Sequence, residues 1–126
     1  SWDDLVSSDF MPFGALNDCP LAMTAHVVYT AIDADRPATT SRDVIERVIR
    51  HAIGYDGCLM SDDLSMRALS GGLGDRAVAA IAAGCDLALH CNGHLDEMDA
   101  VAEAVPVLSG PALVRAGLGP TRRMKA

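Results

Sequence analysis

Two adjacent aspartates follow a short apolar stretch near the middle of the chain, and they are the residues best placed to do chemistry. The stretch Cys58–Met60 predicts a buried strand, and Asp62 and Asp63 follow it after a single serine. A strand that is apolar on both faces is typical of parallel sheets covered by helices. In such α/β folds, ligands bind beyond the carboxyl ends of the strands. We therefore expect a catalytic or ligand-binding carboxylate at Asp62 or Asp63.

Two further apolar stretches also run into polar residues. The stretch 21–27 contains His26 near its end, and the stretch 87–91 leads into His90 and Asn92. Both stretches are predicted to be strands. Because the carboxyl ends of parallel strands lie at the same edge of a sheet, the three polar ends are predicted to share one rim.

Segments with helical spacing separate these strands. Apolar residues recur every three or four positions over about 41–53, where Thr40 and Ser41 are candidate N-caps and Gly54 is the expected stop. Helical segments are also predicted over 9–16, 75–83 (capped by Asp75 and ended by Gly84), 95–105 and 109–116, followed by a fraying tail over 117–126. Alternating strands and helices predict an α/β fold with parallel strands and right-handed crossovers. About three βα units make a partial (β/α)8 barrel, since the whole barrel takes about 250 residues.

The composition favours a single acidic domain. The chain has 126 residues, of which 50% are hydrophobic and 4% aromatic, so the core is expected to consist mainly of aliphatic residues and methionine. A net charge of -7 argues against nucleic acid or an anionic membrane surface as a partner. No apolar run of about 18 residues is present to span a bilayer. We expect no nucleic-acid partner and no membrane association.

The cysteines suggest a reducing compartment. There are four, Cys19, Cys58, Cys85 and Cys91, and two of them lie in or beside predicted strands. Buried, reduced thiols are typical of cytosolic proteins, so we expect a cytoplasmic location and no disulfide between Cys85 and Cys91. A zinc site at His90, Cys91 and His94 is disfavoured, because the spacing matches no known ligand pattern.

Five motifs occur in an order that resembles a known family. They are Met23-Thr24-Ala25-His26-Val27, Asp35-Arg36-Pro37-Ala38-Thr39-Thr40-Ser41, Ile53-Gly54-Tyr55-Asp56-Gly57, Ser61-Asp62-Asp63-Leu64-Ser65-Met66, and Ala83-Gly84-Cys85-Asp86 through Cys91-Asn92. Together they resemble the bacterial β-N-acetylhexosaminidases of glycoside hydrolase family 3, cytosolic enzymes of peptidoglycan recycling. The resemblance covers roughly residues 9–106, and the run from Ser61 to Met66 is its most specific part. It implies that 1–126 is the C-terminal portion, with the last three strands, of that family's N-terminal-type barrel domain.

The resemblance also implies roles for individual residues. Asp62 matches the nucleophile of a retaining glycosidase, which attacks the anomeric carbon and forms a covalent glycosyl-enzyme. Met66 would line the pocket for the N-acetyl group, because a thioether suits a methyl group, with core packing as the alternative. His26 would border the site as a substrate-binding or positioning residue, or would be a buried histidine satisfied by backbone groups. Asp63 is interpreted as a residue that caps the turn or pairs with an arginine, since neighbours after a strand point in different directions.

The implied activity is removal of terminal β-linked N-acetylglucosamine from peptidoglycan fragments, with no metal and no cofactor. The substrate would be a muropeptide or saccharide that contains N-acetylglucosamine. Retaining hydrolysis also needs an acid/base. In the enzymes that this chain resembles, this group belongs to a Lys-His-Phe-Pro-Gly-His-Gly segment upstream of the matched motifs, and these 126 residues do not contain it. We therefore expect the chain to be a portion of such an enzyme, inactive alone and dependent on the N-terminal part of the barrel.

Other interpretations of the paired aspartates stay open at this level. Asp62 and Asp63 could hold a metal in an unrelated α/β enzyme, or bind Mg2+ and accept phosphate in a receiver-like signalling module. A receiver-like module would need a lysine near a later strand end, and Lys125 is the only lysine in the chain. A catalytically inactive structural or binding fragment is the third alternative.

Overall fold

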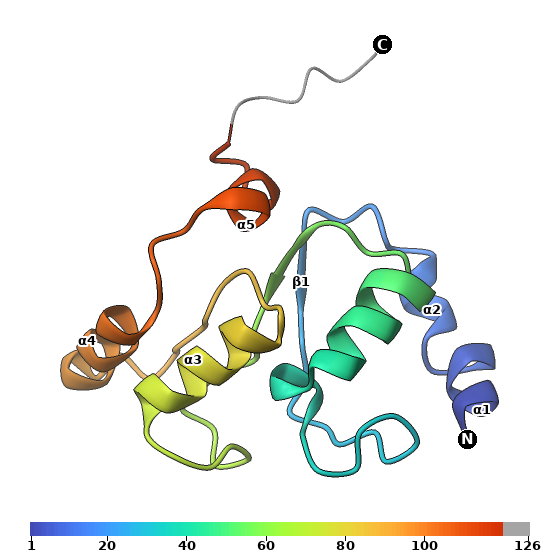
Figure 1. Cartoon of the computed structure of the whole chain (residues 1–126), viewed down its shortest axis with the longest axis horizontal. Coiled ribbons are helices and arrows are strands. Elements are labelled where there is room, and N and C mark those ends of the chain that lie inside the picture. The colour runs from blue at the N-terminus through green and yellow to red at the C-terminus, as the bar shows by residue number, and fades with distance from the viewer. Residues whose placement is uncertain (120–126) are drawn as a thin grey trace.

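The computed structural model describes residues 1–119 and contains a small parallel sheet between helices (Figure 1). The helices are α1 (Trp2–Ser7), α2 (Met11–Gly14), the 3-10 helix η1 (Ala38–Thr40), the π-helix η2 (Val44–Ala52), α3 (Leu73–Ala83), α4 (Leu95–Ala104) and α5 (Gly110–Arg115), and the strands are β1 (Leu21–Met23) and β2 (Cys58–Met60). Figure 1 shows the strands in the middle, with α1 and α2 toward one end of the molecule and α4 toward the other.

The two strands run in parallel, as predicted. Leu21 lies opposite Cys58 and Met23 lies opposite Met60. On the other edge of β2, Leu87 forms a parallel bridge with Met60. The three parallel segments therefore place their carboxyl ends on one side, and the predicted α/β class is confirmed.

Two of the predicted strands are shorter than expected. The stretch 21–27 is a strand only as far as Met23, because beyond it the amide of Asp62 donates to the side-chain hydroxyl of Thr24 rather than to a backbone carbonyl. The stretch 87–91 contributes only the bridge at Leu87. Its ladder stops there because the side-chain hydroxyl of Ser61, rather than a backbone carbonyl, accepts the amide of Leu89 at 2.9 Å. The central strand has the predicted bounds.

The predicted helix over 41–53 is largely a π-helix. The hydroxyl of Ser41 accepts the amide of Val44 at 3.2 Å, so Ser41 caps the helical residues 42–43 that lead into η2. The amide of Ile53 donates to the carbonyl of Val48, five residues earlier, at 2.8 Å. Gly54, at φ 74°, ends the helix in the left-handed region that glycine tolerates best. The stop at Gly54 is thus confirmed, whereas the hydrogen-bond pattern was not foreseen.

Helix α3 begins two residues earlier than predicted. Its N-cap is Gly72, and Asp75 lies within the first turn, so the prediction of Asp75 as the cap was wrong. Gly84 ends the helix at φ 122°, and a Cβ added there would lie 3.0 Å from Ile45. The predicted helices over 95–105 and 109–116 correspond to α4 and α5 within one residue at each end.

The core consists of two clusters of buried side chains. The larger contains Ile45, Leu59 and Leu64, together with the alanines of α3, and lies between β2 and the helices. The smaller joins Phe10 to Val44 and Val48, with Trp2 and Tyr29 packed at its margin, and it gives the amino-terminal helices their place in the fold. The helix α1 was not predicted, and its apolar residues Trp2 and Leu5 are only partly buried against this cluster.

The predicted tail over 117–126 falls mostly beyond the described residues. Within 117–119 the amide of Gly117 donates to Val114 and that of Leu118 donates to Leu113, so these residues still bond to α5. Among residues 1–119, no helix is both long and apolar enough to cross a membrane.

Candidate active site

Asp62 lies at the carboxyl end of β2, where its main chain is held from the neighbouring strand. Its amide donates to the hydroxyl of Thr24, just beyond β1, at 3.1 Å. One of its carboxylate oxygens, Oδ1, accepts the amide of Asp63 at 2.8 Å. For the other oxygen, Oδ2, the described residues provide no hydrogen-bond donor. The half-buried carboxylate is therefore fixed in place and keeps one oxygen free.

Asp63 holds the loop that follows the strand. Its Oδ1 accepts the amides of Ser65 at 3.0 Å and of Cys91 at 3.1 Å, and its Oδ2 accepts the Ser65 hydroxyl at 2.6 Å. Burial works to raise the pKa of Asp63, but these hydrogen bonds outweigh it and keep the pKa below its ordinary value. The interpretation of Asp63 as a turn-capping residue fits this geometry, and both of its oxygens are occupied.

His26 reaches across the rim from the segment after β1. Its Nε2 lies 2.9 Å from the carbonyl oxygen of Asp63. Its Nδ1 lies 2.8 Å from the hydroxyl of Thr39, which in turn lies 2.8 Å from the hydroxyl of Thr24. Both ring nitrogens thus have partners within the chain, which corresponds to a positioning role. A direct contact between His26 and a substrate stays a prediction.

Met66 lies on the exposed side of the same loop. Its side chain is 45% exposed, so core packing within residues 1–119 does not explain it. The loop is fastened by Arg76 of α3, whose Nη1 donates to the carbonyls of Leu64 at 2.7 Å and Met66 at 3.1 Å. Its Nε donates to Gly71 at 3.0 Å. Sequence reasoning missed Arg76, although an arginine one turn after a glycine-rich loop is a natural donor to that loop's carbonyls.

The third parallel segment, 87–91, brings His90 to the rim but forms no metal-binding cluster there among residues 1–119. The Nε2 of His90 lies 2.7 Å from Glu97, which also accepts a hydrogen bond from Asn92. The bond from His90 contributes most to lowering the pKa of Glu97.

Cys91 is exposed while Cys85 is buried, and burial raises the pKa of the Cys85 thiol to about 12. Within 1–119, no three His, Cys, Asp or Glu side chains lie close enough together to hold a metal ion.

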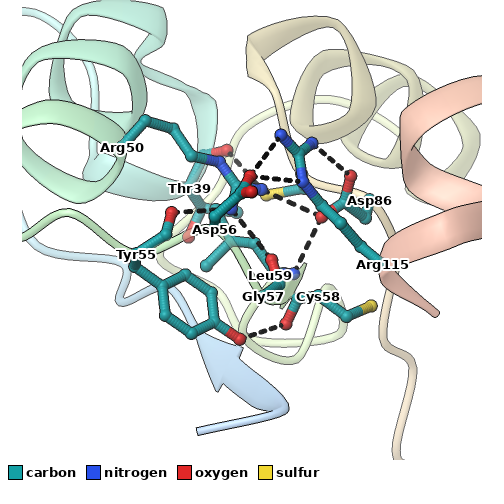
Figure 2. A network of polar contacts seen from close by, with 10 residues as sticks. Thr39, Arg50, Tyr55, Asp56, Gly57, Cys58, Leu59, Asp86 and Arg115 are labelled. Carbon is teal, nitrogen blue, oxygen red and sulfur yellow. Dashed lines mark hydrogen bonds and ion pairs between the residues drawn. The ribbon is translucent and has the colours of Figure 1, made fainter. Parts of the chain in front are cut away.

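A buried ion-pair network lies at the opposite end of β2, and sequence reasoning missed it. Figure 2 shows Arg50 and Arg115 meeting at Asp86. One Asp86 oxygen, Oδ2, accepts both Arg50 and the amide of Leu59, each at 2.9 Å, and Oδ1 accepts Arg115 at 3.3 Å. Arg50 also donates to the carbonyl of Gly57 at 2.8 Å. The sequence signal for this network was Asp86 itself, which directly precedes a predicted strand. A carboxylate buried at such a position must be paired with a cation or hydrogen-bonded.

The two ends of β2 therefore carry different groups. The amino end is held by the buried ion-pair network, whereas the carboxyl end carries Asp62, whose Oδ2 has no hydrogen-bond donor among residues 1–119. This division, with ligand-binding groups at the carboxyl ends of parallel strands and stability at the amino ends, is typical of (β/α)8 barrels. The fold and the rim define the chain as part of an α/β-barrel domain of that kind.

The sequence comparison identifies the family. The model of the glycosyl hydrolase family 3 N-terminal domain matches residues 1–113. The chain belongs to this family, and the resemblance inferred from its motifs is confirmed.

Relatives and solved structures agree with this assignment. The chain is 40% identical to a β-hexosaminidase of Tolumonas auensis over 87% of this chain and 32% of the relative. It is 41% identical to a β-hexosaminidase of Thiobacillus denitrificans over 91% of this chain and 32% of the relative. The structure of a glycoside hydrolase family 3 β-N-acetylglucosaminidase from Paenibacillus superposes with a TM-score of 0.69 at 36% identity, covering 85% of this chain and 20% of that one. The chain thus spans about a third of the length of these curated relatives.

Proposed function

We propose that this chain supplies the nucleophile of a retaining β-N-acetylhexosaminidase, and that the nucleophile is Asp62. The observation that carries the proposal is the carboxylate at the end of β2, with Oδ1 bound to the amide of Asp63 and Oδ2 without a donor among residues 1–119. A nucleophile needs this combination of a fixed position and an available oxygen. The names of the relatives, β-hexosaminidase in two cases, support the type of sugar.

The reaction would proceed in two displacements. A carboxylate oxygen of Asp62 attacks C1 of the N-acetylglucosamine unit, the bond from C1 to the leaving oxygen breaks, and that oxygen takes a proton from a general acid. Water then gives its proton to the same group, now a base, and attacks C1, which releases Asp62 as a carboxylate. Asp63 is not available as a second catalytic group, because both of its oxygens accept hydrogen bonds.

The acid/base and most of the sugar contacts are proposed to come from the rest of the barrel. The exposed apolar side chains of β1 support this, since Leu21 and Met23 are 55% and 53% exposed on a strand paired on one edge. Beside them is an apolar cavity of about 300 Å3, lined in part by Phe13 and Leu16. Further barrel strands would cover such a surface.

The remaining features of the substrate follow from the family resemblance. We propose that Met66, exposed on the loop after Asp62, contacts the N-acetyl methyl group. We also propose a muropeptide or related saccharide as the substrate, peptidoglycan recycling as the process, and the cytoplasm as its location, for which the free cysteines are the supporting observation.

A graft tests the assignment of Asp62. The chain is assayed alone, and residues 1–113 are also used to replace the matching segment of the Tolumonas auensis β-hexosaminidase. We expect the graft, but not the chain alone, to hydrolyse 4-nitrophenyl N-acetyl-β-glucosaminide. Asp62→Ala in the graft should lower kcat by about a thousandfold or more. Asp99→Ala, an exposed aspartate on α4, is the matched control and should leave kcat unchanged.

Azide then distinguishes a lost nucleophile from a damaged fold. Azide is a small anion that can occupy the space left in Asp62→Ala, so it should restore turnover of the aryl glycoside and give the α-glycosyl azide. If Asp62→Ala in the graft keeps normal activity, Asp62 is not the nucleophile.

A further inference from the structure

We propose that Thr39 is a positioning residue for the nucleophile, acting through a directed hydrogen-bond relay that runs Asp62, Thr24, Thr39, His26, Asp63. This inference rests on the proposed role of Asp62. The relay starts at the amide of Asp62 and ends at the carbonyl of Asp63, so it clamps the two-residue segment at its first N–H and its last C=O.

The relay consists of four contacts of ordinary hydrogen-bond length. Asp62 N to Thr24 Oγ1 is 3.1 Å, Thr24 Oγ1 to Thr39 Oγ1 is 2.8 Å, Thr39 Oγ1 to His26 Nδ1 is 2.8 Å, and His26 Nε2 to Asp63 O is 2.9 Å. The two threonines in its middle are buried, with 5% and 0% of their surface exposed. Buried hydroxyls cannot exchange their partners for water, so the relay is fixed by the protein alone.

Counting protons gives the relay one direction. The amide of Asp62 can only donate, so Thr24 Oγ1 accepts there and has its single proton left for Thr39. The carbonyl of Asp63 can only accept, so His26 must carry a proton on Nε2. Thr39 receives from Thr24 and gives its own proton to Nδ1 of His26, which makes the imidazole neutral with its proton on Nε2. In this arrangement each hydroxyl accepts one hydrogen bond and donates one.

The opposite direction would need a proton on both ring nitrogens of His26 and would leave the proton of Thr24 without a good acceptor. If Nδ1 of His26 carried a proton, Thr39 would accept from it and donate to Thr24. Thr24 would then accept from both Asp62 and Thr39, and its own proton would be left to a weak acceptor such as the thiol of Cys85, which lies beside it. The structure therefore assigns one tautomer to His26 and one orientation to both hydroxyls.

The position of Thr39 explains its effect on Asp62. It lies in η1, and among residues 1–119 no backbone ladder connects η1 to β2. Its hydroxyl is fully buried and bonds to Thr24 and His26 rather than to the carboxylate of Asp62. Its loss would let the segment Asp62–Asp63 shift, and a displacement of about 1 Å at a catalytic group can cost about a hundredfold in rate.

The test uses Thr39→Val, which replaces the hydroxyl by a methyl group of similar size, and Thr39→Ser, which retains the hydroxyl. In the graft, Thr39→Val should lower kcat by about ten- to a hundredfold and leave KM within about twofold. Thr39→Ser should keep most of kcat. Equal kcat for the two variants would overturn the positioning role, because the hydroxyl would then have no effect.

Nitrogen-15 NMR of His26 in the 126-residue chain is the second readout, and it is independent of activity. Nε2 should carry the proton that is donated to Asp63, and Nδ1 should carry the signature of a hydrogen-bonded acceptor. That signature should be lost in Thr39→Val and retained in Thr39→Ser. A proton on Nδ1 in the unaltered chain would overturn the relay without any variant. An inactive unaltered graft combined with the expected NMR result would refute the proposed function and uphold the relay.

Discussion

The hydroxyl of Thr24 accepts the backbone amide of Asp62 across 38 positions of sequence, at 3.1 Å. The bond is made beyond the last paired residues of β1 and β2, where the ladder would otherwise give way to a free loop. It extends the order of the sheet to the residue proposed to attack the sugar. Local sequence cannot supply such a bond, since the two residues meet only when the strands pair.

Thr24→Val should therefore lower the free energy of unfolding. The substitution leaves the amide of Asp62 without its acceptor, and a lost hydrogen bond of this kind costs about 1–2 kcal/mol. Thr24→Ser keeps the acceptor and is the matched variant. Urea unfolding followed by circular dichroism should give a lower midpoint for Thr24→Val than for Thr24→Ser. Identical midpoints would mean that the bond contributes nothing to stability.

Asp86→Asn should be among the most destabilising single changes. The Asp86 side chain is 4% exposed and accepts two arginines and the amide of Leu59, so its neutralisation leaves the largely buried Arg50 without its carboxylate partner and Arg115 with Asp56 alone. Breaking a buried pair in this way costs about 3–5 kcal/mol. Asp56→Asn is the control, because Asp56 lies at the exposed end of the same network, with its side chain 81% exposed. Its pair with Arg115 should contribute less than about 1 kcal/mol. Equal unfolding free energies for the two variants would contradict the burial argument.

Asp63 should make the fold sensitive to acid. Hydrogen bonds from Ser65 and Cys91 keep its pKa lower in the folded chain than the ordinary value of about 3.9. A carboxyl with a lowered folded pKa stabilises the fold at pH values above its unfolded pKa, and that stabilisation is lost as the pH falls through the folded pKa. The melting temperature should thus fall as the pH decreases below about 4. Asp33 and Glu97, whose pKa values are also lowered, should contribute in the same sense.

Asp63→Asn isolates the share of Asp63 in this behaviour. The variant should be less stable than the unaltered chain at neutral pH, and the difference between the two should shrink as the pH falls below about 4. Differential scanning calorimetry of both chains from about pH 7 to pH 3 measures this difference. A difference that stays constant over the range would show that the folded-state pKa of Asp63 is not lowered.

The cysteines should fall into separate reactivity classes. Cys91 is exposed, whereas Cys58 and Cys85 are buried. Burial raises the pKa of both buried thiols, that of Cys85 to about 12, so they stay protonated near pH 8 and do not react as thiolates. N-ethylmaleimide followed by peptide mass spectrometry should label Cys91 first and Cys85 only when the chain unfolds. In Cys91→Ser the fastest phase should disappear. Early labelling of Cys85 in the native chain would contradict its burial.

Predictions succeeded where local chemistry decides the outcome. The strand Cys58–Met60 is apolar on both faces, and the helices ending at Gly54 and Gly84 stop where a positive φ is needed, so neighbouring residues alone define them. The stretch 87–91 was predicted too long, because its pairing depends on Ser61, a residue of another segment. The cap at Asp75 was also wrong, since α3 begins at Leu73 and its N-cap is Gly72.

The sequence by itself determined the class of fold, the family, and the aspartate that ends the central strand, because each depends on residue types at short spacing. Only the tertiary structure decided how that aspartate is held. Thr24, Thr39 and His26 meet the segment Asp62–Asp63 through contacts spanning 13 to 38 positions. Asp86 likewise finds Arg50 and Arg115 at separations of 36 and 29 positions. Such partners are chosen by the packing of parallel strands against helices, and no pattern within one segment of sequence specifies them.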